Sequence, residues 1–127
     1  MAARQVLWRY PFERAVAATP AVRDDGTVLV ADMTGRLQAI KPDGSLAFQC
    51  KTDCEYLLAP PVCDARGQAF VSDPTGAIHR IEPGGEGRAL FEAPRALQAQ
   101  ASFDARGRLY LPCTDRHVYV FRNLAAI

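Results

Sequence analysis

The chain has 127 residues, with 15 Lys and Arg against 14 Asp and Glu and 49% hydrophobic residues. This length allows one domain, residues 1–127, and excludes a large multidomain enzyme. The net charge of +1 leaves no basic surface for nucleic acid or an acidic membrane, so neither is an expected partner. The N-terminus lacks the apolar core of a signal peptide, which predicts a cytoplasmic protein with mostly reduced cysteines.

Taken in chain order, the sequence predicts short β-strands divided by glycine-containing turns, with no sustained helical period. A first strand covers residues 6–10 (VLWRY). Three groups of strands, labelled a to d within each group, follow it. Their expected bounds are 19–23, 27–32, 36–40 and 45–49, then 60–64, 68–73, 77–81 and 88–92, then 100–104, 108–113 and 117–121. The third group lacks its strand d.

These groups are copies of one repeat, covering about residues 18–58, 59–98 and 99–123. Gly26, Gly67 and Gly107 align at spacings of 41 and 40 residues, and each is expected to close the a–b hairpin at positive φ. Asp32 and Asp73 also align. A 40-residue period with four strands is typical of a β-propeller blade.

The first repeat, ATPAVRDDGTVLVADMTGRLQAIKPDGSLAFQ, resembles the repeat of the pyrroloquinoline-quinone-type (PQQ-like) β-propellers. The shared features are the Pro-Ala-Val start, the DG turns and the fourth strand, where that family carries Trp. Phe48 and Phe91 stand at the Trp position here, and Trp8 keeps it. The resemblance implies a propeller fold. None of the family's cofactor ligands can be placed on this sequence, so no cofactor is expected.

Three blades cannot close a ring, since propellers use about four to eight. We therefore expect an all-β open half-ring of three four-stranded blades that closes by oligomerisation, with residues 6–10 serving as a strand d. A homodimer forming a six-bladed ring is favoured, because closed symmetry is the common route. In the alternative, the chain is a fragment or subunit of a larger propeller, and a different chain supplies the remaining blades. The expected seam consists of Val6, Leu7, Trp8, Tyr10, Val118, Tyr119, Val120 and Phe121.

The cysteines and histidines predict no metal or catalytic site. Cys50 and Cys54 form a single C-x3-C pair, whereas zinc sites show two such pairs or a pair with His partners. We interpret the pair as thiols of the d–a connector, able to form a labile disulfide. Cys63 and Cys113 are expected to be small buried residues. His79 and His117 fall on strands of different repeats, and His79 is expected to face the layer between blades.

Asp32 and Asp73 end a strand b before the turns MTG and PTG, where a carboxylate accepts hydrogen bonds from the turn's own N–H groups. The b–c turns and d–a connectors of a propeller also share one rim, which provides a second hypothesis. On that hypothesis a polar ligand or a protein binds a rim of mixed charge. Its residues are Arg14, Asp32, Asp53, Tyr56, Asp73, Arg95, Asp115 and Arg116.

Two function classes follow from this organisation. The first is a non-enzymatic propeller scaffold that assembles with itself and presents a binding rim. The alternative is a ligand-binding or catalytic propeller whose site forms only in the closed ring. The sequence favours the scaffold, because no residues show the spacing of a nucleophilic site.

Overall fold

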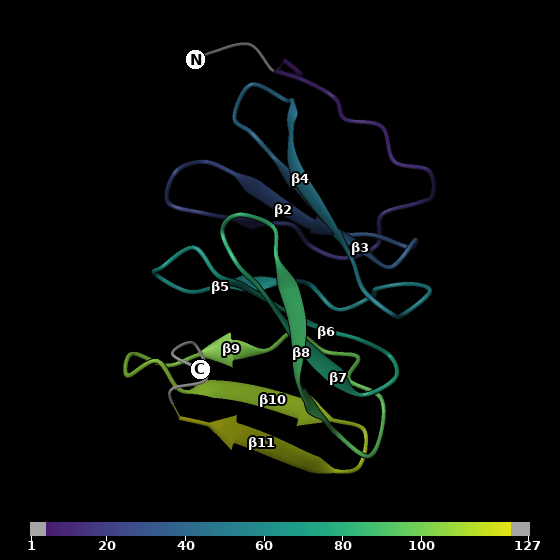
Figure 1. Ribbon diagram of the computed structural model, residues 1–127, viewed down its shortest axis with the longest axis vertical. Helices are drawn as coiled ribbons and strands as arrows, with labels where there is room; N and C mark the ends of the chain where they lie inside the picture. Colours follow the sequence, from purple (N-terminus) through teal and green to yellow (C-terminus); the bar gives the residue numbers. More distant parts are fainter. Residues whose placement is uncertain (1–4, 123–127) are drawn as a thin grey trace.

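A computed structural model describes residues 5–122, and every regular element in that range is a β-strand (Figure 1). The strands form three antiparallel sheets that lie one after another along the longest axis of the molecule. The expectation of an all-β chain is therefore confirmed. Within the same range, no helix could serve as a membrane span.

Each sheet corresponds to one repeat, and its strands pair in chain order. The first sheet contains β1 (Ala21–Val22), β2 (Val28–Ala31), β3 (Arg36–Ile40) and β4 (Leu46–Lys51). The second sheet contains β5 (Val62–Cys63), β6 (Ala69–Ser72), β7 (Ala77–Ile81) and β8 (Gly87–Glu92). The third sheet contains β9 (Ser102–Phe103), β10 (Leu109–Cys113) and β11 (His117–Phe121). The third strand of each repeat has its predicted bounds, whereas the first is shorter than predicted.

The a–b hairpins have the predicted conformation at all three glycines. Gly26, Gly67 and Gly107 have φ values of 88°, 83° and 80°. The amide of each glycine donates to the carbonyl three residues earlier, at 2.9, 3.1 and 3.0 Å. Because a residue without Cβ adopts this left-handed region at little cost, the glycine sets the turn and thereby the register of the strands after it.

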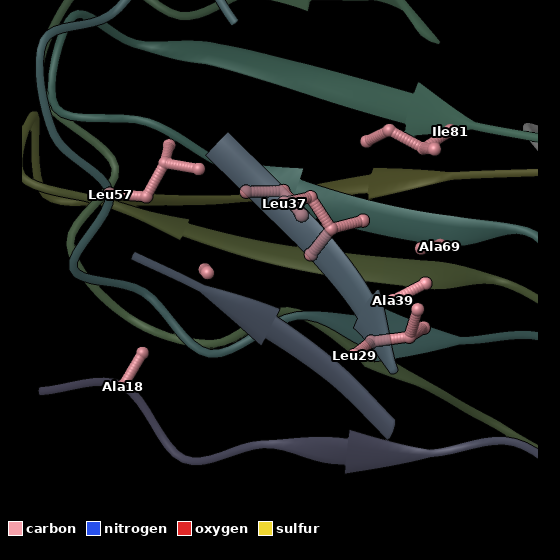
Figure 2. Packing of buried hydrophobic residues seen from close by; sticks show 9 residues of the cluster. Ala18, Leu29, Leu37, Ala39, Leu57, Ala69 and Ile81 are labelled. Carbon is pink, nitrogen blue, oxygen red and sulfur yellow. The ribbon is translucent and has the colours of Figure 1, made fainter. Parts of the chain in front are cut away.

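The core consists of two apolar layers between the sheets. Leu29 and Leu37 of the first sheet pack with Ala69 and Ile81 of the second, and all four are 0% exposed (Figure 2). On the opposite face of the second sheet, Phe70 and Ile78 pack against Leu109 and Leu111 of the third sheet. Strand alternation produces this arrangement, because successive side chains point to opposite faces. The middle sheet is consequently buried on both faces.

Residues 6–10 do not form a strand in the single chain, and the third sheet has three strands instead of four. The reason is geometric. The N-terminal segment lies beside the first sheet, whereas β11, its expected partner, lies at the opposite end of the stack (Figure 1). A β-strand needs a neighbouring strand for its backbone hydrogen bonds, and none reaches this segment within the described residues.

Candidate functional site

The turn between the second and third strands of each sheet, called the b–c corner below, holds the most elaborate polar arrangement in the described part of the chain. Oδ1 of Asp32 accepts hydrogen bonds from the Thr34 amide at 2.9 Å, the Thr34 hydroxyl at 2.7 Å and the Arg36 amide at 3.1 Å. These bonds close the turn between β2 and β3. The expectation that Asp32 serves its own turn is confirmed.

Asp73 repeats this arrangement in the second sheet. Its Oδ1 accepts from the Thr75 amide at 2.9 Å, the Thr75 hydroxyl at 2.6 Å and the Ala77 amide at 3.0 Å. The first and second repeats therefore both use a D-x-T-G sequence, in which one carboxylate oxygen receives three donors of the turn.

The second carboxylate oxygen reaches across to the following strand, a contact that sequence analysis did not predict. Oδ2 of Asp32 accepts from Nε2 of Gln38 at 2.7 Å, and Oδ2 of Asp73 lies 2.5 Å from Nε2 of His79. In the third sheet, where Cys113 replaces the aspartate, Asp115 accepts instead from the Tyr119 hydroxyl. A polar residue six positions after each D-x-T-G aspartate is the signal that could have revealed this pairing.

The electrostatics show that the Asp73 carboxylate is ionised. Burial by itself raises the pKa of this carboxyl, but hydrogen bonds from His79, Thr75 and the Ala77 amide outweigh it and lower the pKa to about 2. A carboxylate only accepts hydrogen bonds, so Nε2 of His79 carries the proton that it shares with Asp73. In the third sheet, the hydrogen bond to Asp115 raises the pKa of Tyr119 to about 12.

The connectors that follow β4 and β8 are attached to these same corners. The Leu57 amide donates to the Asp32 carbonyl at 2.9 Å, and the Leu97 amide donates to the Asp73 carbonyl at 3.3 Å. The Thr52 amide also donates to the Gly35 carbonyl at 2.9 Å. The structure thus brings the b–c turns and the d–a connectors together in each of the first two repeats.

The predicted rim residues divide into two groups by exposure. Asp32 and Asp73 are each 2% exposed, and their carboxylates accept hydrogen bonds from residues of their own repeats. Asp115 is half-buried and bonded to Tyr119. The exposed members of the rim are Arg14, Asp53, Tyr56, Arg95 and Arg116. Any ligand at this rim would therefore meet mainly arginine, Tyr56 and Asp53, and not the two repeated aspartates.

Cys50 differs from its sequence-based interpretation, because it lies on β4 and not in the connector. Its thiol and that of Cys54 are both free, so no disulfide joins them. Burial raises the pKa of the Cys50 thiol, which disfavours the thiolate. Cys63 and Cys113 are only half-buried, not fully buried as expected.

Two crevices lie beside the corners and have matching walls. One, of about 120 Å³, lies between the first and second sheets and is lined by residues 50–53 together with His79 and Arg88. The other, of about 180 Å³, is lined by residues 10–13 together with Asp32, Gln38 and Gln49. Neither crevice brings together a nucleophile, a base and an orienting group at hydrogen-bond distances. Among residues 5–122, no three His, Cys, Asp or Glu side chains are placed to hold a metal ion.

Comparison with known proteins shows what fold this arrangement belongs to. No family model and no curated protein matches the chain. Among solved structures, BamB from Moraxella catarrhalis is similar over 91% of this chain, with a TM-score of 0.71 and 18% identity. Streptogramin B lyase is similar over 88% of the chain, with a TM-score of 0.68 and 12% identity. Both are β-propeller proteins.

The chain has a propeller-type fold. A protein of unknown function from Bacteroides caccae is also similar, over 94% of this chain, with a TM-score of 0.64 and 17% identity. The chain spans only 47%, 36% and 43% of the lengths of the Bacteroides, Moraxella and lyase structures. The three sheets are thus blades of a partial propeller. At these identities the likeness concerns the fold alone.

Proposed function

We propose that this chain is a self-assembling propeller scaffold, in which two copies close a six-bladed ring that presents the connector rim to a protein partner. The observation that carries the proposal is the open side of the third blade. Val118 and Val120 are 61% and 51% exposed there, and the outer edge of β11 pairs with no strand among the described residues. Exposed apolar side chains beside an unpaired edge are typical of a surface that binds another chain.

The repeat identifies what this surface would normally contact. Val118 occupies the position of Ile78 in the second blade and Leu37 in the first. Both of those residues are 0% exposed, because each packs against the blade that follows it. The third blade has the same kind of face, and no blade covers it among the described residues. The first blade of a second copy would supply that contact, with Gln38 and Ile40 standing where the second blade has His79 and Ile81.

A two-fold axis would create this contact twice, because the third blade of each copy meets the first blade of the other. Such a closed arrangement leaves no blade face uncovered at either seam. It also places the rims of the two copies in one circle. The exposed residues Arg14, Asp53, Tyr56, Arg95 and Arg116 would then form a mixed-charge binding surface on one side of the ring.

Size-exclusion chromatography with light scattering tests the assembly. At micromolar concentration we expect a mass about twice the 13.9 kDa of one chain. Val118→Lys should reduce the mass to that of one chain, because it places a charge in the seam. Leu58→Lys is the matched control, since Leu58 is 38% exposed on the connector between the first and second blades, away from the seam. A folded wild-type monomer at that concentration would refute the proposal.

The rim is tested by the double variant Arg95→Glu/Arg116→Glu. Because both side chains are exposed and lie on turns or connectors, the double variant should keep the mass and the circular dichroism of the wild type. Loss of the dimer in this variant would mean that the rim is part of the seam and is not available to a partner.

A further inference from the structure

The N-terminal segment lies against the first blade in the same way that β4 lies against the second blade. A Cβ built on Gly44 would lie 2.8 Å from Cγ of Trp8. A Cβ built on Gly85, the equivalent turn of the second blade, would lie 3.0 Å from Cγ of Phe48. Trp8 stands 40 residues before Phe48, one repeat earlier. Trp8 also donates from its indole nitrogen to the Pro42 carbonyl at 3.0 Å, which holds the segment to this turn.

The two crevices provide a second, independent match. Residues 50–53 line the crevice beside His79, and residues 10–13 line the crevice beside Gln38. Residues 10–13 again stand one repeat before residues 50–53, and Gln38 stands one repeat before His79. The half-buried Tyr10 and Phe12 also pack edge to face, with ring centroids 5.2 Å apart. The segment therefore holds the place of a strand d that belongs to a blade preceding the first.

Strands a, b and c of that preceding blade are not found among the described residues before β1. β4 is hydrogen-bonded along its length to β3, whereas residues 6–10 have no strand beside them. β11 is the third strand of its blade and has the complementary defect, a free edge where a fourth strand belongs. Within one chain the two lie at opposite ends of the stack (Figure 1), so they cannot pair with each other.

We infer that residues 6–10 are a pre-positioned outer strand that pairs with β11 of a second copy of this chain, with Trp8 as its anchor. The inference rests on the proposed ring and specifies how each seam is closed. The pairing of β3 with β4 sets the expected register. Leu37 opposes Cys50 and Ala39 opposes Phe48 in that pair. Val118 and Val120 stand two repeats after Leu37 and Ala39, and Tyr10 and Trp8 stand one repeat before Cys50 and Phe48. The same register therefore places Val118 opposite Tyr10 and Val120 opposite Trp8.

Disulfide trapping between two single variants tests this register. Tyr10→Cys and Val118→Cys are purified separately, mixed, and oxidised with glutathione disulfide. We expect a covalent dimer on a non-reducing gel from the mixture and none from either variant alone, because only the mixture brings the two new thiols together across a seam. Mixing Leu7→Cys with Val118→Cys is the control, since Leu7 lies three residues out of register and is 80% exposed.

The outcomes separate this inference from the proposed function. A covalent dimer from the Tyr10→Cys mixture alone supports the pairing. If wild-type protein is a dimer by light scattering but neither mixture links, the segment does not pair with β11 and the inference is overturned while the ring remains. Equal linking in both mixtures overturns the register. A monomeric wild type overturns both proposals.

Discussion

The attachment of the first connector to its corner predicts that two glycines with the same backbone conformation differ in their tolerance of alanine. Gly35 and Gly107 have φ values of +79° and +80°. Alanine at either position pays about 1 kcal/mol for a left-handed backbone. At Gly107 nothing lies within 4 Å of the added Cβ, so no further cost is expected.

At Gly35 the added methyl group would lie 1.9 Å from the Cys54 carbonyl oxygen, so the connector has to move away. That movement disrupts the bonds from the Thr52 amide and hydroxyl to the Gly35 carbonyl, which are 2.9 and 2.8 Å long. Each such bond contributes about 1 kcal/mol net. Gly35→Ala should therefore reduce the free energy of unfolding by about 3 kcal/mol, against about 1 kcal/mol for Gly107→Ala.

Urea denaturation followed by circular dichroism measures both values, and the slope with denaturant should stay constant. The cost of the left-handed backbone is the same in both variants, because the two glycines have nearly the same φ, so the difference between the variants reports the connector alone. Equal losses of stability in the two variants would refute the reasoning. The connector would then yield without loss of its hydrogen bonds, and it would not hold the rim residues Asp53 and Tyr56 in a defined place.

Three further predictions concern the corners and the N-terminus. Folding lowers the pKa of Asp73 from its ordinary value of 3.8 to about 2, so the stability that it contributes is present above about pH 4 and is lost as the pH falls towards 2. The difference in stability between wild type and Asp73→Asn should therefore close over that window, and a difference independent of pH would contradict this prediction. His79→Leu leaves a buried carboxylate oxygen of Asp73 without its donor and should lower the free energy of unfolding by about 1–3 kcal/mol. His79→Gln copies the pair of Asp32 with Gln38 and should lower it much less. Thermal melts of both variants measure this difference. Deletion of residues 1–10 should lower both the oligomer mass and the melting temperature more than any loop change does, and an unchanged mass and melting temperature would exclude the segment from assembly.

Local sequence determined the strands and their turns. The bounds of β3, β7 and β11 follow from period-two alternation, and the hairpin glycines follow from the need for positive φ. The repeat length determined the number of sheets, since a pattern of four strands recurs every 40 or 41 residues. The turn-closing bonds of Asp32 and Asp73 were also predictable, because an aspartate binds donors only two and four residues away.

Tertiary structure decided what depends on contacts between distant residues. Pairing of Asp73 with His79 needs two neighbouring strands in a defined register, and burial of the pair needs the adjacent blade. Cys50 appeared to be half of a connector motif, but its strand continues to Lys51 and directs its thiol into a layer between blades. Residues 6–10 have the composition of a strand, yet a strand forms only where another backbone offers its hydrogen bonds, and none lies near among residues 5–122.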